Sequence, residues 1–92
     1  MVQIIGVRTS TGATHELHIT SVRWYSPQDG TISDATVPVM VDFIIDKRGY
    51  AYTCNGSLIA RVEVATTAEG AQYIRTAPDA STTDNLLSLP RF

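Results

Sequence analysis

The segment from Thr36 to Gly49 constrains the fold most, because it is the one stretch of the chain with a clear helical pattern. Thr36 is suited to the N-cap, and Pro38 is tolerated in the first helical turn. Lys47 and Arg48 are expected in the last turn, with Gly49 as a left-handed stop. The apolar positions follow the spacing of an amphipathic helix: Val37, Met40, Val41, Ile44 and Ile45. The rest of the chain must therefore pack on this helix.

The region before the helix predicts two strands. Val2–Val7 is short and rich in β-branched residues, and His15–Tyr25 alternates apolar and polar side chains. The apolar positions of the second segment change parity after Ile19, so we expect a break or bulge near Ser21 that restores one buried face. Ser26–Gly30 has the composition of a turn.

The region after the helix predicts a hairpin. Tyr50–Cys54 and Ser57–Thr66 are joined by Asn55-Gly56, which favours a two-residue type I′ turn. This turn would place Tyr52 opposite Ile59. The face expected to meet the helix is made of alternate residues: Ala51, Thr53, Leu58, Ala60, Val62 and Val64.

A third strand is expected at Gln72–Thr76, after a loop in which Gly70 takes a left-handed conformation. This loop would pair Val64 with Ile74. The elements together predict an α+β domain in the order ββαβββ, with a mostly antiparallel sheet of four or five strands and one helix packed on one face.

The 92 residues are expected to form a single domain. Residues 76–92 are predicted to dock on the sheet as a C-terminal segment, because the exposed apolar residues of a free tail would be a liability. Docking on the face opposite the helix would let Leu86–Leu89 cover that face.

The composition excludes several classes of protein. A net charge of −2 without runs of like charge argues against binding to duplex nucleic acid. No apolar run reaches the ~20 residues of a membrane span, and the N-terminus does not resemble a signal peptide, so a cytoplasmic protein is expected. Cys54 is the single cysteine, which excludes an internal disulfide.

The sheet face opposite the helix carries the main candidate site. Its expected residues are Tyr50, Tyr52, Ile59, Arg61, Glu63, Tyr73 and Arg75. One interpretation is structural, with cross-strand pairs covered by the C-terminal segment. A second is a platform that stacks a nucleotide or single-stranded nucleic acid, and a third is a homodimer surface.

His18 is the candidate for chemistry. In a strand, His15 and His18 point to opposite faces, so they cannot share a metal ion, and no metal or other cofactor is predicted. A small enzyme that uses His18 with Asp84 or Arg75 is one alternative. Asp84 and Asn85 could recognise a polar edge of a ligand, or could cap the turn that follows them. The full set of candidate ligand- or partner-binding residues is His18, Trp24, Tyr50, Tyr52, Arg61, Tyr73, Arg75, Asp84 and Asn85.

Two motifs carry a resemblance to a known family. They are Tyr73-Ile74-Arg75-Thr76 and the closing Asp84-Asn85-Leu86-Leu87-Ser88-Leu89-Pro90, with looser agreement at His18-Ile19-Thr20, Trp24, Phe43, Ile44 and Tyr52. With these motifs the chain resembles a group of small prokaryotic and phage proteins classed as a domain of unknown function. The resemblance implies a stand-alone domain with an integral C-terminal tail, and it implies no activity.

No nucleophile, base and orienting group can be assembled from the motifs. We therefore expect a non-catalytic binding or protein-interaction module with an unknown partner. One form of such a module is a homodimer.

Overall fold

The computed structural model describes residues 1–10, 18–55, 58–77, 86 and 89–92. Its elements are β1 (Val2–Thr9), β2 (Ile19–Tyr25), β3 (Ile32–Thr36), α1 (Val37–Ile45), β4 (Ala51–Asn55), β5 (Leu58–Thr66) and β6 (Gln72–Thr76). The strands form one sheet in the order β3-β2-β1-β4-β5-β6, in which β1 and β4 are parallel and the other neighbours are antiparallel. The α+β class with one helix on one face is confirmed.

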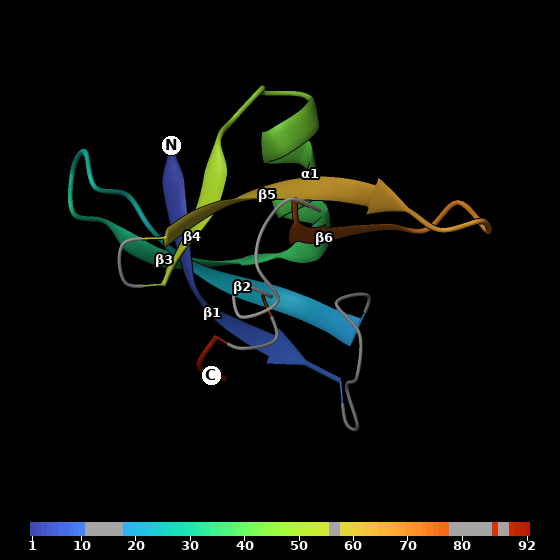
Figure 1. Cartoon of the computed structure of the whole chain (residues 1–92), viewed down its shortest axis with the longest axis horizontal. Coiled ribbons are helices and arrows are strands. Elements are labelled where there is room, and N and C mark those ends of the chain that lie inside the picture. The colour runs from blue at the N-terminus through green and yellow to red at the C-terminus, as the bar shows by residue number, and fades with distance from the viewer. Residues whose placement is uncertain (11–17, 56–57, 78–85, 87–88) are drawn as a thin grey trace.

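The sheet curves around α1. The helix contacts β2 and β3 in one half of the sheet and β5 and β6 in the other half. A flat sheet of six strands could not bring both halves to one short helix, so the strands must twist and curl toward it. Figure 1 shows this arrangement: β5 and β6 pass beside α1, whereas β1 and β2 lie below these elements in the view.

The core lies between the helix and the concave face of the sheet. Its buried residues are Ile4, Val7, Ile19, Val22, Val37, Met40, Val41, Ala51, Val62, Ile74 and Leu86. Thr53 and Ala60 are also buried, so the predicted apolar face of the β4–β5 hairpin faces inward, apart from Leu58, whose side chain lies outside the described residues. In the helical stripe Ile44 is half-buried, whereas Ile45 is 47% exposed and lies outside the core.

The start of the helix is as predicted and its end is not. Thr36 is the N-cap, and its Oγ1 accepts a hydrogen bond from the Val39 amide at 3.5 Å. The helix ends at Ile45, so Lys47 and Arg48 lie beyond the last turn. The left-handed residue is Arg48, with φ at 52°, and not Gly49. The Gly49 amide instead donates to the Phe43 carbonyl at 2.8 Å, which closes the helix with a wide turn.

The expected bulge in the second strand is confirmed. Arg8 pairs with Ser21 and Thr9 pairs with Ile19, so Thr20 is the extra residue of β2. This bulge lets both Ile19 and Val22 face the core. A second irregularity lies in β1, where Ile5 is left between the paired residues Ile4 and Gly6.

The predicted order ββαβββ omitted strand β3. This strand lies directly before the helix in the chain and pairs with β2. Four of the five residues of β3 are exposed, so the segment has no apolar alternation that would predict a strand. Its pairing includes Arg23 opposite Asp34, a contact between segments that sequence spacing alone does not connect.

The predicted register of the first hairpin was wrong by two residues, and that of the second was right. Tyr52 lies opposite Arg61 rather than Ile59, because Asn55 is the last paired residue of β4. The shift preserves the face of every side chain, since both partners keep their parity. The conformation of Gly56 lies outside the described residues. In the second hairpin Val64 pairs with Ile74, and Gly70 has φ at 91° as expected.

The last residues of the C-terminal segment, 90–92, lie beside β1. Strands β1 and β4 pair only at Val2–Ala51 and Gln3–Tyr52. The irregularity at Ile5 bends β1, so its far half presents a free edge at Val7. There the Val7 amide donates to the Pro90 carbonyl at 2.9 Å, and the Phe92 amide donates to the Val7 carbonyl at 3.2 Å. The C-terminal end is thereby held alongside β1 (Figure 1).

Within the part of the chain that the structure describes, no helix is long and apolar enough to cross a membrane.

Candidate functional site

The convex face of strands β4 to β6 gathers most of the predicted candidate residues. We call this surface the outer face and define it by Met1, Tyr50, Tyr52, Ile59, Arg61, Glu63, Tyr73 and Arg75. Two subsites follow from the register, because Tyr52 pairs with Arg61 between β4 and β5, whereas Glu63 pairs with Arg75 between β5 and β6.

The tyrosine end of the outer face is open. The rings of Tyr50 and Tyr52 have centroids 6.1 Å apart and are tilted by 39°, and the Arg61 guanidinium carbon lies 5.5 Å from the Tyr50 ring centroid. Two apolar neighbours are strongly exposed, Met1 at 59% and Ile59 at 64%. Met1, Ile59 and the two tyrosines line a shallow depression of about 290 Å³.

The arginine end of the outer face is less accessible. Arg75 Nε lies 3.1 Å from Glu63 Oε1 in an ion pair that is half-buried. Tyr73, on the same strand as Arg75, is also half-buried. Because Glu63 already neutralises Arg75, this end offers less to an anionic ligand than Arg61 does.

The prediction that Leu86–Leu89 covers the outer face is wrong for Leu86. Leu86 is completely buried in the core, and Leu89 packs against the same core cluster. Leu87 lies outside the described residues.

Trp24 belongs to a different site, on the helix side of the sheet. It is half-buried and lines an apolar pocket of about 250 Å³ between α1 and strands β1 to β3. The residues that line this pocket are Val2, Trp24, Ala35, Val39, Met40, Phe43 and Lys47. It shares no residue with the depression on the outer face.

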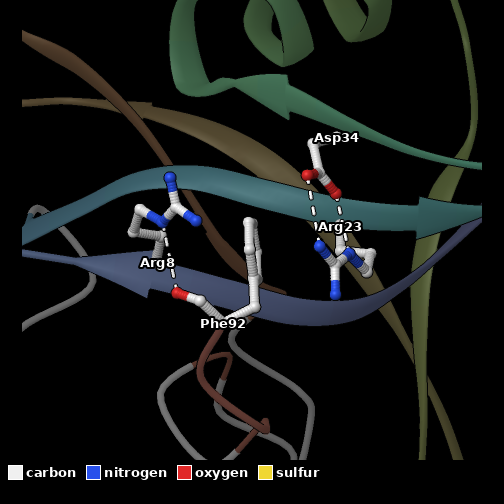
Figure 2. Close-up of polar contacts among 4 residues, drawn as sticks. All are labelled: Arg8, Arg23, Asp34 and Phe92. Atoms are coloured by element: carbon white, nitrogen blue, oxygen red, sulfur yellow. Dashed lines mark hydrogen bonds and ion pairs between the residues drawn. The ribbon is translucent and has the colours of Figure 1, made fainter.

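A cluster of charged and aromatic groups holds the C-terminal end on β1 and β2. Figure 2 shows the Phe92 ring between two guanidinium groups, with Arg8 Cζ at 4.8 Å and Arg23 Cζ at 4.3 Å from the ring centroid. Arg8 Nε also donates to the Phe92 main-chain oxygen at 3.2 Å. Arg23 binds both carboxylate oxygens of Asp34, at 2.8 and 3.3 Å. These hydrogen bonds hold the pKa of Asp34 below its ordinary value.

Sequence reasoning did not find this cluster. Arg8 and Arg23 lie 15 positions apart, and only the β1–β2 pairing brings them together. Asp34 lies on the strand that was not predicted. The residue in the sequence that marks this contact is Gly6, which has no side chain to block the approach of the C-terminal end. A β-carbon at Gly6 would lie 3.3 Å from both the Phe92 ring and the Pro90 carbonyl oxygen.

Of the two predicted partners of His18, the structure describes only Arg75. His18 is half-buried directly before β2, and its carbonyl accepts a hydrogen bond from the Ser10 amide at 3.0 Å. Arg75 is engaged by Glu63 on the outer face. Asp84, Asn85 and His15 lie outside the described residues. No cluster of histidine, cysteine and acidic side chains with the geometry for a metal ion exists among the residues that are described.

These features define a small α+β domain with a curled, six-stranded sheet around one short helix. The chain belongs to the family described as Protein of unknown function (DUF3892), whose model matches residues 3–90. The expectation of a family of unknown function is thereby confirmed. Comparisons with the curated proteins and with the solved structures gave no match.

Proposed function

We propose that this protein is a non-catalytic interaction module that binds a protein partner, in the cytoplasm, through the tyrosine end of its outer face. The observation that carries the proposal is the depression lined by the exposed Met1, Tyr50 and Ile59 and the half-buried Tyr52. Contacts at the centres of protein interfaces are rich in tyrosine and arginine and are surrounded by apolar contacts that exclude water.

The neighbouring charges favour a protein partner of a particular kind. Arg61 is exposed beside Tyr50, and among the ion pairs described on this face the acidic residue Glu63 is engaged by Arg75. Arg61 is therefore available to a carboxylate of the partner at the rim of the apolar contact. A second copy of the chain is the first partner to test, since most soluble oligomers are homo-oligomers.

Binding of a nucleotide or single-stranded nucleic acid is the second candidate. The observation in its favour is that two tyrosine rings and the Arg61 guanidinium lie within a few ångströms of one another. Aromatic rings stack on bases and arginine binds phosphate, so this set could bind a short single strand. The exposed Met1 and Ile59 beside the rings favour a protein over a polyanion.

Site-specific photocrosslinking in the producing cells separates these candidates. A photoreactive phenylalanine derivative placed at Ile59 would report what lies against the outer face. The matched control is the same substitution at Ile32 on β3, which is exposed to a similar degree, 59% against 64%, and lies outside the depression.

The proposal expects a discrete protein adduct from position 59 and none from position 32. An adduct with twice the mass of the chain would identify a homodimer. An adduct that disappears on nuclease treatment would replace the proposal by the nucleic-acid candidate. The absence of any adduct specific to position 59 would overturn both.

A further inference from the structure

The apolar pocket beneath Trp24 lies on the helix side of the sheet, away from the outer face. We infer that this pocket is a binding site for a small carboxylate with an apolar body, such as an arylalkanoate, whose carboxylate meets Lys47 at the opening. This site is distinct from the proposed interaction surface and does not depend on it.

The size of the pocket sets the size of the ligand. A buried apolar cavity of about 150 Å³ is large enough to bind benzene. The volume here is about 250 Å³, which leaves room for one six-membered ring and a short chain. It lies below the usual range of about 300–1,000 Å³ for drug-sized ligands, so larger polycyclic molecules do not fit.

The walls of the pocket select an apolar body. Trp24 and Phe43 provide aromatic surface, and Val2, Ala35, Val39 and Met40 provide aliphatic surface. Val39 is 58% exposed, although it lies on a helix whose neighbouring residue Met40 is buried. A ligand that covered Val39 would remove this apolar surface from water, which is favourable in proportion to the area covered.

The charge at the opening selects an anion. Lys47 is the one charged residue among the seven that line the pocket, and its side chain is 71% exposed. Its ammonium lies 3.7 Å from Asp42 Oδ2, in an ion pair that is exposed to solvent. Such pairs contribute little free energy, so a ligand carboxylate can compete for the ammonium. Aromatic walls alone would also attract cations, but the positive charge of Lys47 opposes them.

Trp24 makes binding directly measurable, because it is the single tryptophan of the chain. Three matched probes share one body and differ in the end group: 3-phenylpropanoate, 3-phenylpropan-1-ol and 3-phenylpropylamine. Each is titrated into the whole chain while Trp24 emission is recorded, and NMR shifts of the Val39, Met40 and Lys47 amides locate the site. A ligand of this size is expected to bind in about the millimolar range.

We expect saturable binding with the carboxylate about two- to fivefold tighter than the alcohol, the range given by one exposed ion pair. The amine should bind more weakly than both. The variant Lys47→Met keeps the aliphatic stem and should make the carboxylate and the alcohol equal. The variant Val39→Trp should fill the pocket and abolish binding of all three probes, whereas Ile32→Trp, at a similarly exposed position outside the pocket, should leave binding unchanged.

Three results would overturn the inference. The first is the absence of saturable binding of the carboxylate to the unmodified chain. The second is equal affinity for the carboxylate and the alcohol, which would remove the role of Lys47. The third is unchanged binding to Val39→Trp, which would place the probe elsewhere. Crosslinking from Ile59 is independent of all three, so failure here and failure of the proposed function are distinguishable.

Discussion

The ring of Phe43 occupies the space that a β-carbon on Gly49 would need. The same two residues are joined along the backbone, because the Gly49 amide donates to the Phe43 carbonyl at 2.8 Å. This contact fixes the chain between α1 and β4, and it also sets the position of the Phe43 side of the apolar pocket. Gly49 is therefore required for close packing rather than for a left-handed turn.

Gly49→Ala is expected to destabilise the fold by about 1–3 kcal/mol, the usual cost of overpacking a site that cannot relax freely. Urea unfolding measures this loss. The double variant Gly49→Ala, Phe43→Leu should recover part of it, because the smaller side chain frees the space. A Gly49→Ala chain as stable as the parent would contradict the contact.

Leu86→Ala is expected to cost about 2–5 kcal/mol, because Leu86 is completely buried and its loss leaves a cavity in the core. Leu89→Ala is the matched control and should cost clearly less, since Leu89 is only partly buried at the edge of the same cluster. Denaturant unfolding of the two variants gives the comparison. Equal losses would show that the segment does not anchor the fold through Leu86.

Asp34→Asn is expected to lower the melting temperature at neutral pH. Arg23 holds the pKa of Asp34 below its ordinary value. The ionised carboxylate therefore stabilises the folded state fully at pH values above the ordinary pKa of an aspartate. This contribution is lost as the pH falls through the lowered pKa of the folded state. The gap between the variant and the parent should thus be widest near neutral pH and close in strong acid. A difference in melting temperature that does not depend on pH would rule out the Arg23–Asp34 pair as its cause. The control is Glu69→Gln, in the exposed turn before β6.

Asp46→Asn is expected to have the opposite effect. The neighbouring Asp42 raises the pKa of Asp46 through their hydrogen bond and the repulsion of the two charges. A carboxyl group with a raised pKa in the folded state destabilises that state once it is ionised. Asp46 is also the C-cap, where the helix dipole disfavours a negative charge.

The variant Asp46→Asn should therefore melt at a higher temperature than the parent at pH 7, and this gain should shrink as the pH falls through the raised pKa of Asp46. Thermal unfolding across the acid range measures both effects. A lower melting temperature at pH 7 would contradict this assignment.

One of the two candidate sites could be predicted from the sequence, and the other could not. Alternation within β4 and β5 placed Tyr52 and Arg61 together on the outer face, although their direct pairing differs from the expected register. The pocket could not be inferred in this way. Trp24 and Phe43 lie on different elements, and their approach depends on how far the sheet curls toward the helix.

What the sequence determined by itself was local. The N-cap at Thr36, the bulge beside Ser21, the left-handed Gly70 and the inward residues Thr53 and Ala60 all follow from spacings within about a dozen residues, where backbone geometry leaves few choices. The tertiary structure decided three other features: the exposed strand β3 pairs with β2, β1 pairs with β4 at only two residues, and Leu86 is buried in the core. These outcomes depend on which unpaired edge and which unfilled volume remain after the local elements have packed, and no spacing along the chain records that.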